Sequence, residues 1–130
     1  MANIKTNPVA YFEVPVIDMQ RAVRFYQALF DFRFEKEELD GYDMAFFPFY
    51  STEPGITGAL VKGDVYRPSK NGVILYFNTD HIDNTLNKAI LLNAKILYPK
   101  TINEEYGFII AEIEDCEGNR IALRQNTKEN

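Results

Sequence analysis

Residues that could carry out chemistry are few in this chain of 130 residues. It holds one histidine, His81, and one cysteine, Cys116. A single cysteine excludes an internal disulfide and a thiolate metal cluster. Cys116 stands between Asp115 and Glu117, and neighbouring anions raise the pKa of a thiol, so the sequence disfavours a nucleophilic cysteine. His81 directly precedes a helical pattern, which favours a capping role at a helix start over catalysis.

Glu13 is the residue best placed for acid–base chemistry. It lies in the segment VAYFEVPV (9–16), whose side chains alternate between two faces as in a strand, with Tyr11 on the same face. A carboxylate there could act as a general base or bind an amine of a ligand. The structural alternative is an ion pair with Arg124 or Arg120, because a buried charge requires a partner. Both interpretations stay open at this point.

Two similar halves must position these residues. Asp18 is typical of a helix N-cap, and apolar residues at three- and four-residue steps predict a helix over 19–30. The segments FRFEKE, YDMAFFPF and GALVK are expected to be strands, and Pro48 limits the second of them. The same order returns as the strand GVILYFNT, a second helix and the strands AKILYP, YGFIIAEIE and NRIALRQ. The expected apolar stripe of that second helix comprises Ile82, Leu86, Ala89 and Ile90, and Asn93 is expected to end it in the left-handed conformation.

The duplication is visible when the chain is shifted by 63 positions. Gly55 then falls on Gly118, and Ala59 on Ala122, within an identical G-x-x-x-A-L pattern. The sequence therefore predicts a single α+β domain of two paired βαβββ modules, one at about 8–62 and one at about 72–125. Neither module alone has a generous core, so we expect the two to pair, with the helices outside and the sheets curving around a cup. Such a cup is the natural place for a small-molecule ligand.

Composition narrows the function classes. Nineteen acidic residues against fourteen basic ones give a net charge of −5, which disfavours nucleic acid as a partner. No apolar run is long enough for a membrane span, and the first residues lack the apolar block of a secretory signal, so we expect a cytoplasmic protein without a membrane partner. Ten phenylalanines and eight tyrosines are an unusual feature. One aromatic cluster could either wall an apolar pocket or pack in the core: Met44, Phe46, Phe47, Phe49 and Tyr50.

Three segments carry a family resemblance: FEVPVIDMQRAVRFYQALFDFRF, the block GALVKG and the turn DCEGNRIAL. Together they resemble the glyoxalase / bleomycin resistance / extradiol dioxygenase superfamily, also called vicinal oxygen chelate proteins, over roughly residues 8–125. The resemblance implies a cup in which His or Glu side chains from the first and last strand of each module hold a divalent metal. Carried onto this chain, the four positions are occupied by Tyr11, Ala59, Ile74 and Ala122. None is a usual metal ligand, so we expect no metal and no other cofactor.

Three functional hypotheses follow. The first is a metal-free, homodimeric protein that binds a small, partly apolar molecule among Tyr11, Glu13, Tyr76, Asn78 and Arg124. The second is an enzyme, a lyase, isomerase or dioxygenase, that uses unorthodox metal ligands such as Glu13 with Glu112, or metal-free acid–base catalysis by Glu13. The third is a domain whose cup is filled by its own side chains and which works through a protein partner. The sequence does not decide whether the protein is an enzyme and does not identify a ligand.

Overall fold

The two halves fold into two four-stranded sheets with one helix each. The computed structural model describes residues 7–39 and 41–128. The first half contains β1 (Phe12–Pro15), α1 (Met19–Phe30), β2 (Glu35–Leu39), β3 (Tyr42–Phe46) and β4 (Gly58–Lys62). The second contains β5 (Leu75–Asn78), α2 (Ile82–Leu91), β6 (Lys95–Asn103), β7 (Phe108–Glu114) and β8 (Arg120–Asn126). This confirms the predicted α+β class and its βαβββ units.

The strand order is the same in both sheets. The first is ordered β1-β4-β3-β2 and the second β5-β8-β7-β6, and in each the first strand runs parallel to the last strand of its unit. Gly55 and Gly118 both have positive φ angles, 102° and 94°, which side chains rarely adopt, and this explains why glycine recurs 63 positions on. Ala59 and Ala122 are both fully buried. The duplication seen in the sequence is therefore a duplication of structure.

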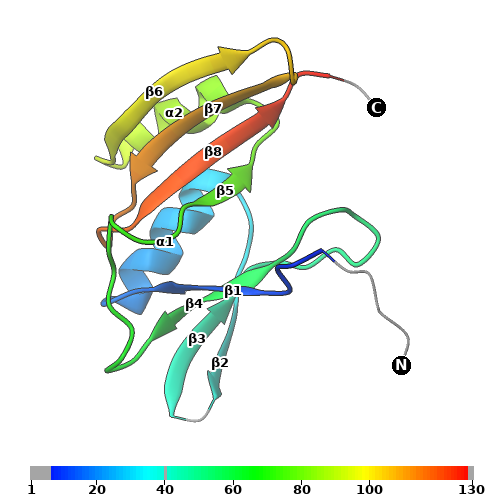
Figure 1. Ribbon diagram of the computed structural model, residues 1–130. Coiled ribbons are helices and arrows are strands. Elements are labelled where there is room, and N and C mark those ends of the chain that lie inside the picture. The colour runs from blue at the N-terminus through cyan, green and yellow to red at the C-terminus, as the bar shows by residue number, and fades with distance from the viewer. Residues whose placement is uncertain (1–6, 40, 129–130) are drawn as a thin grey trace, which may run out of the picture.

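Helix α1 begins and ends where the sequence predicts. The Asp18 side chain accepts a hydrogen bond of 3.0 Å from the backbone N–H of Arg21, as an N-cap does. The chain leaves the helix through Asp31, which has a φ angle of 57°. The apolar steps predict a stripe of Met19, Ala22, Val23, Tyr26 and Phe30. The first four are buried, Phe30 is partly buried, and Phe25 and Leu29 join the buried face. In Figure 1, α1 lies behind the gap between the two sheets, so one helix covers parts of both.

Helix α2 departs from the prediction at two residues. His81 is the residue before the helix, but its side chain makes no cap hydrogen bond; the Gln125 side chain accepts the N–H of Ile82 instead, at 2.8 Å. The expectation that His81 caps the helix was therefore wrong, because a longer side chain from β8 reaches the same amide. Ile90 was also wrongly placed on the buried stripe: it is 57% exposed. Asn93 follows the helix with a φ angle of 65°, as predicted.

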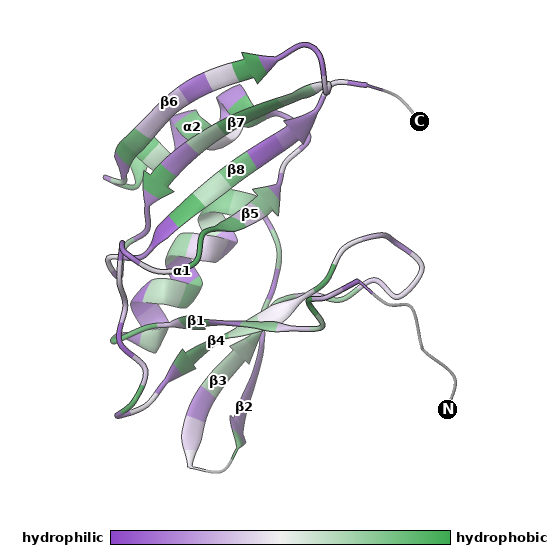
Figure 2. Ribbon diagram, in the orientation of Figure 1, coloured by the Kyte–Doolittle hydropathy of each residue, from purple (hydrophilic) through white to green (hydrophobic). Residues whose placement is uncertain are grey.

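Much of the aromatic content lies in the core where the two units meet. The ring of Phe47 lies 5.5 Å from Phe12, 5.7 Å from Tyr26 and 5.6 Å from Phe77, measured between centroids. Core packing thus accounts for Phe47, whereas Phe49 and Tyr50 are exposed. The outer strand β2 is hydrophilic along most of its length (Figure 2) and exposed at every residue.

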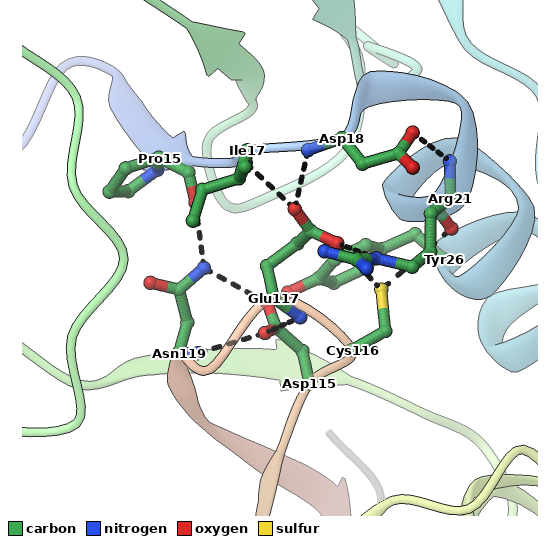
Figure 3. A network of polar contacts seen from close by, with 9 residues as sticks. All are labelled: Pro15, Ile17, Asp18, Arg21, Tyr26, Asp115, Cys116, Glu117 and Asn119. Carbon is green, nitrogen blue, oxygen red and sulfur yellow. Dashed lines mark hydrogen bonds and ion pairs between the residues drawn. The ribbon is translucent and has the colours of Figure 1, made fainter. Parts of the chain in front are cut away.

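The turn between β7 and β8 joins the second unit to the first. Glu117 lies in this turn, and its Oε1 accepts hydrogen bonds from the backbone N–H groups of Ile17 and Asp18, at 2.7 and 2.8 Å, while its Oε2 pairs with Arg21 at 2.5 Å (Figure 3). A carboxylate at the start of α1 also complements the positive end of the helix dipole. Burial would raise the pKa of Glu117, but Arg21 and the two amides outweigh it, so the pKa lies below its usual value.

Two further side chains of the same turn reach the first unit. Asn119 donates from Nδ2 to the carbonyl of Pro15 at 2.8 Å, and the Tyr26 hydroxyl donates to Asp115 at 2.6 Å (Figure 3). Burial raises the pKa of Asp115, although the hydrogen bonds that its carboxylate accepts from Tyr26, Asn119 and Glu117 act in the opposite direction. The Asp-to-Gly turn is formed as predicted, with the Gly118 N–H facing the Asp115 carbonyl. The sequence motif at this turn therefore adds a set of polar contacts to the apolar core that the two units share.

Candidate functional site

Two cavities lie along the seam between the two units, and each is lined by residues of both β1 and β5. The first, which we call the Glu13 cavity, has a volume of about 450 Å³. Its walls include Tyr11, Glu13, Arg67, Ser69, Val73 and Arg120. The second, the Tyr76 cavity, has a volume of about 490 Å³. Its walls include Phe32, Tyr50, Ile56, Ile74, Tyr76 and Asn78. Both volumes are within the range of small-molecule sites.

The five predicted ligand-binding residues do not converge on one cavity. Tyr11 and Glu13 line the Glu13 cavity, and Tyr76 and Asn78 line the Tyr76 cavity. The two cavities share apolar walls, including Val73. Arg124 lines neither; it borders a third hollow together with Asn78. The structure thus spreads these side chains along the seam instead of gathering them around a single point.

Glu13 is held by two phenols. Its Oε2 accepts a hydrogen bond of 3.1 Å from the Tyr11 hydroxyl, and its Oε1 accepts one of 2.7 Å from the Tyr66 hydroxyl. Burial and this hydrogen bond raise the pKa of Tyr11 to about 12, and the hydrogen bond to Glu13 raises the pKa of Tyr66 as well. Both phenols therefore keep their protons at neutral pH, and the pair surrounds the carboxylate without neutralising it.

The predicted ion pair of Glu13 with Arg124 or Arg120 was wrong. Arg120 pairs with Glu112, and the guanidinium carbon of Arg124 lies 4.5 Å from the centre of the Phe108 ring. The reason is the strand order. Strand β8, which carries both arginines, lies between β5 and β7 in the second sheet, whereas β1 pairs with β4 at the edge of the first sheet. Each arginine therefore finds its partner within its own sheet.

Sequence reasoning missed Tyr66, which lies in the segment 63–72 that connects the two units. Its ring packs 5.4 Å from that of Tyr42, over a small apolar cluster on the first sheet: Met44, Ala59 and Val61, with Phe46 at its edge. Gly63 allows the backbone of this segment to pass close to Tyr42, since a Cβ at position 63 would lie 2.1 Å from the Tyr42 ring. One signal was present in the sequence. The run GALV is apolar at every position, which is typical of a strand covered on both faces.

The comparison with family models identifies the family. The model described as the Glyoxalase/Bleomycin resistance protein/Dioxygenase superfamily matches residues 9–123. The chain belongs to this superfamily. The residues matched include β1 and most of β8, so the family assignment covers both units of the duplicated fold.

Solved structures of the glyoxalase family share the fold. Glyoxalase I from Zea mays superposes with a TM-score of 0.72 at 20% identity, over 92% of this chain and 46% of its own, so this chain spans about half of that protein. A glyoxalase family protein from Bacillus cereus gives 0.71 at 14% identity, over 98% and 99% of the two chains. A glyoxylase/bleomycin resistance protein/dioxygenase domain from Frankia sp. EAN1pec gives 0.71 at 15% identity, over 94% and 99%. No curated protein matches the sequence.

The metal positions implied by the superfamily do not fit a divalent ion in this chain. Ala59, Ile74 and Ala122 have no donor atom in their side chains, and the Tyr11 hydroxyl donates to Glu13. Ala59 lies beneath Tyr66 in the apolar cluster, and Ala122 stands opposite Glu112, which pairs with Arg120. Nowhere in residues 7–39 and 41–128 do three His, Cys, Asp or Glu side chains come together as a metal site would require.

The other residues considered for metal binding or catalysis either lie on different sheets or are unreactive. Glu13 and Glu112, suggested as unorthodox ligands, lie on different sheets, one held by phenols and the other by Arg120. Burial and the adjacent carboxylates raise the pKa of the Cys116 thiol to about 12, which disfavours the thiolate form that a nucleophile needs. Within the described part of the chain, neither helix has the length and apolarity needed to cross a membrane.

Proposed function

We propose that this chain is a member of the superfamily that works without a metal and binds a small, partly apolar organic molecule in the seam between its two units. The observation that carries the proposal is the residue set at the four metal positions: a phenol already committed to Glu13, one isoleucine and two buried alanines. The two cavities supply the binding volume, with apolar walls and a few polar groups, as small-molecule sites usually have.

Metal analysis tests the first half of this proposal. The protein is stripped with a chelator, reloaded separately with Mg²⁺, Mn²⁺, Zn²⁺ and Ni²⁺, dialysed and measured for bound metal per chain. We expect no stoichiometric binding and no change in melting temperature on reloading. One tightly held ion per chain, lost when Tyr11 or Glu13 is substituted, would overturn the metal-free assignment.

A metabolite panel tests the second half. We expect at least one organic compound to raise the melting temperature and to shift NMR signals of residues that line the seam, such as Val73 and Tyr76. Val73→Asp, which places a charge on a wall shared by both cavities, should weaken that binding. Leu91→Asp is the matched control, because Leu91 is 83% exposed on α2 and lines neither cavity. If no compound of the panel binds in the seam, the result would favour the hypothesis that the protein works through a protein partner.

A metal-free acid–base enzyme is the second candidate function. The observation in its favour is the direct hydrogen bond from Tyr66 to Glu13 beside a cavity, because a carboxylate and a phenol can exchange a proton with a bound molecule. Glu13→Gln would then abolish turnover of an identified substrate while the fold is retained. Unchanged turnover in that variant would remove the role of Glu13.

We also propose that the protein is a homodimer. The support is a row of side chains across the second sheet, in which Tyr76, Ala122, Glu112 and Tyr98 are neighbours in the ladder. The two tyrosines at its ends are 50% and 43% exposed, so a second copy that covers them would remove aromatic surface from water. Sedimentation equilibrium should give twice the mass of the chain, and a monomer at micromolar concentration would contradict the proposal.

A further inference from the structure

We propose that Glu13, Tyr11 and Tyr66 form a recognition site for a primary ammonium group, so that the ligand of the Glu13 cavity is an organic amine with an apolar body. This inference rests on the proposed small-molecule function and names the chemical class of the ligand.

The three side chains have no hydrogen left to donate. Each phenol has one hydrogen, and both hydrogens go to Glu13, one to each carboxylate oxygen. An ionised carboxylate accepts about four hydrogen bonds, and each phenol oxygen can still accept. Tyr11 and Glu13 line the cavity and present acceptors alone to it, while Tyr66, which is not a lining residue, donates to Glu13 from beside the cavity. A ligand group that binds there must bring the donors, and a primary ammonium brings three.

The charge of Glu13 is not compensated by a cation. Among the described side chains, no ion pair includes Glu13, whereas Glu112 on the second sheet pairs with Arg120. The two phenols stay protonated, so the cluster has a net charge of about −1 at neutral pH. A cationic donor is favoured over a neutral one by this charge, since hydrogen bonds to charged groups are stronger than neutral ones.

Two arginines face the same cavity and limit where the ammonium can lie. Arg120 is neutralised by Glu112. Arg67 lines the cavity and forms no ion pair with any described residue. It is not within ion-pairing distance of Glu13, so it leaves the carboxylate accessible to a ligand. Its positive charge repels an ammonium, and its removal should strengthen binding of a simple amine.

The walls of the cavity fit an apolar body on the amine. Val9 and Val73 line it and are 55% and 89% exposed without a ligand. A ligand that covers them removes apolar surface from water, which is favourable in proportion to the area covered. The volume of about 450 Å³ is at the lower end for small-molecule sites, so a molecule with one ring and a short chain is the matching size.

The test compares phenethylamine with three relatives of similar size: 2-phenylethanol, 3-phenylpropionate and the N,N,N-trimethyl derivative of phenethylamine. Each is titrated into ¹⁵N-labelled protein, and dissociation constants are taken from the shifts of the amides around Glu13 and Tyr66. We expect phenethylamine to bind most tightly and the trimethyl derivative more weakly, because it keeps the charge but has no N–H to donate.

Variants assign the effect to the cluster. Glu13→Gln should weaken phenethylamine binding by about tenfold or more, the usual value of a hydrogen bond to a charged group. Tyr66→Phe should weaken it by less, and Arg67→Gln should strengthen it. Glu37→Gln on the exposed strand β2 changes the net charge by the same amount as Glu13→Gln, and Tyr106→Phe removes an exposed phenol elsewhere; both controls should leave binding unchanged.

The outcomes separate this inference from the proposed function. Tighter binding of 3-phenylpropionate, lost in Arg67→Gln, would overturn the amine class and leave small-molecule binding intact. Equal binding of phenethylamine and 2-phenylethanol, or no effect of Glu13→Gln, would overturn the inference in the same way. No binding by any of the four probes would also overturn it, and the metabolite panel described above would then decide whether the seam binds anything.

Discussion

The first and second units share one topology but treat the carboxylate on their open sheet face in opposite ways. Glu112 in the second unit is buried and paired with Arg120. Glu13 in the first unit is exposed and held by two neutral phenols, one of which comes from the connecting segment. The duplication has kept the strand order, the positive-φ glycines and the buried alanines. The two carboxylates are not repeat mates, because a shift of 63 positions places Glu13 on Tyr76. Their different surroundings separate a side chain that stabilises the fold from one that is accessible to a ligand.

The turn that joins the units gives the largest expected effect. Glu117→Gln keeps one acceptor for the amides of Ile17 and Asp18 but turns a donor toward Arg21, so we expect the free energy of unfolding to fall by about 3 kcal/mol, within the range for losing charge-assisted hydrogen bonds of a buried carboxylate. Urea denaturation measures it. A loss below about 1 kcal/mol would mean that the turn is not the main connection between the units.

The same variant has a predicted pH dependence. The pKa of Glu117 lies below its ordinary value of 4.5, so its stabilising contribution is present above that value and is lost as the pH falls through the lower folded-state pKa. The difference in unfolding free energy between the natural chain and Glu117→Gln should therefore be constant from pH 7 to about 5 and shrink in more acidic buffer. A difference that grows on acidification would contradict the sign of this shift.

The second largest effect is expected when Glu112 loses its partner, and it tests the contrast between the two carboxylates directly. Arg120→Leu leaves Glu112 without a cation in a buried position, and we expect a loss of about 2 kcal/mol, smaller than for a fully buried pair because the Arg120 side chain is 35% exposed. Adding Glu112→Gln to the same chain should restore most of the loss. If the double variant is as unstable as the single one, packing of Arg120 and not its charge is what matters.

The smallest effect is expected at the other carboxylate. Glu13→Gln should change the free energy of unfolding by less than about 0.5 kcal/mol, because the side chain is exposed and glutamine still offers one acceptor to the phenols. Thermal and urea unfolding measure this alongside Arg120→Leu. A loss as large as that of Arg120→Leu would make Glu13 a structural carboxylate and remove the contrast between the units.

The parts of the fold that could be predicted from sequence are those set by local pattern. Asp18 and the apolar stripe predict where α1 begins and ends. The shared G-x-x-x-A-L pattern predicts the duplication. The strand predicted at FRFEKE instead begins at Glu35, because Phe32 and Phe34 belong to the aromatic cluster around Phe47. Periodicity assigns a side chain to a face but does not say which distant group meets it there.

The candidate site depends on such distant groups, which explains what was missed. The face of Glu13 followed from alternation, but its partners did not, because no ladder joins β1 to β8 and the phenol of Tyr66 arrives from a segment without periodicity. The same limit applies to Gln125, which caps α2 from 43 positions away. In each case the missing information is a contact between elements that are far apart in the chain.

Because of Tyr66, the segment 63–72 has a second role besides connecting the two units. A link that only joins two halves can be lengthened, nicked or rerouted at little cost, but this one inserts an aromatic ring over the first sheet and passes Tyr42 at a glycine. A version of the protein expressed as two separate polypeptides would still have both sheets, yet one of the two phenols on Glu13 would then depend on where the cut was made. The segment that joins the two units therefore also supplies a side chain to the proposed binding site.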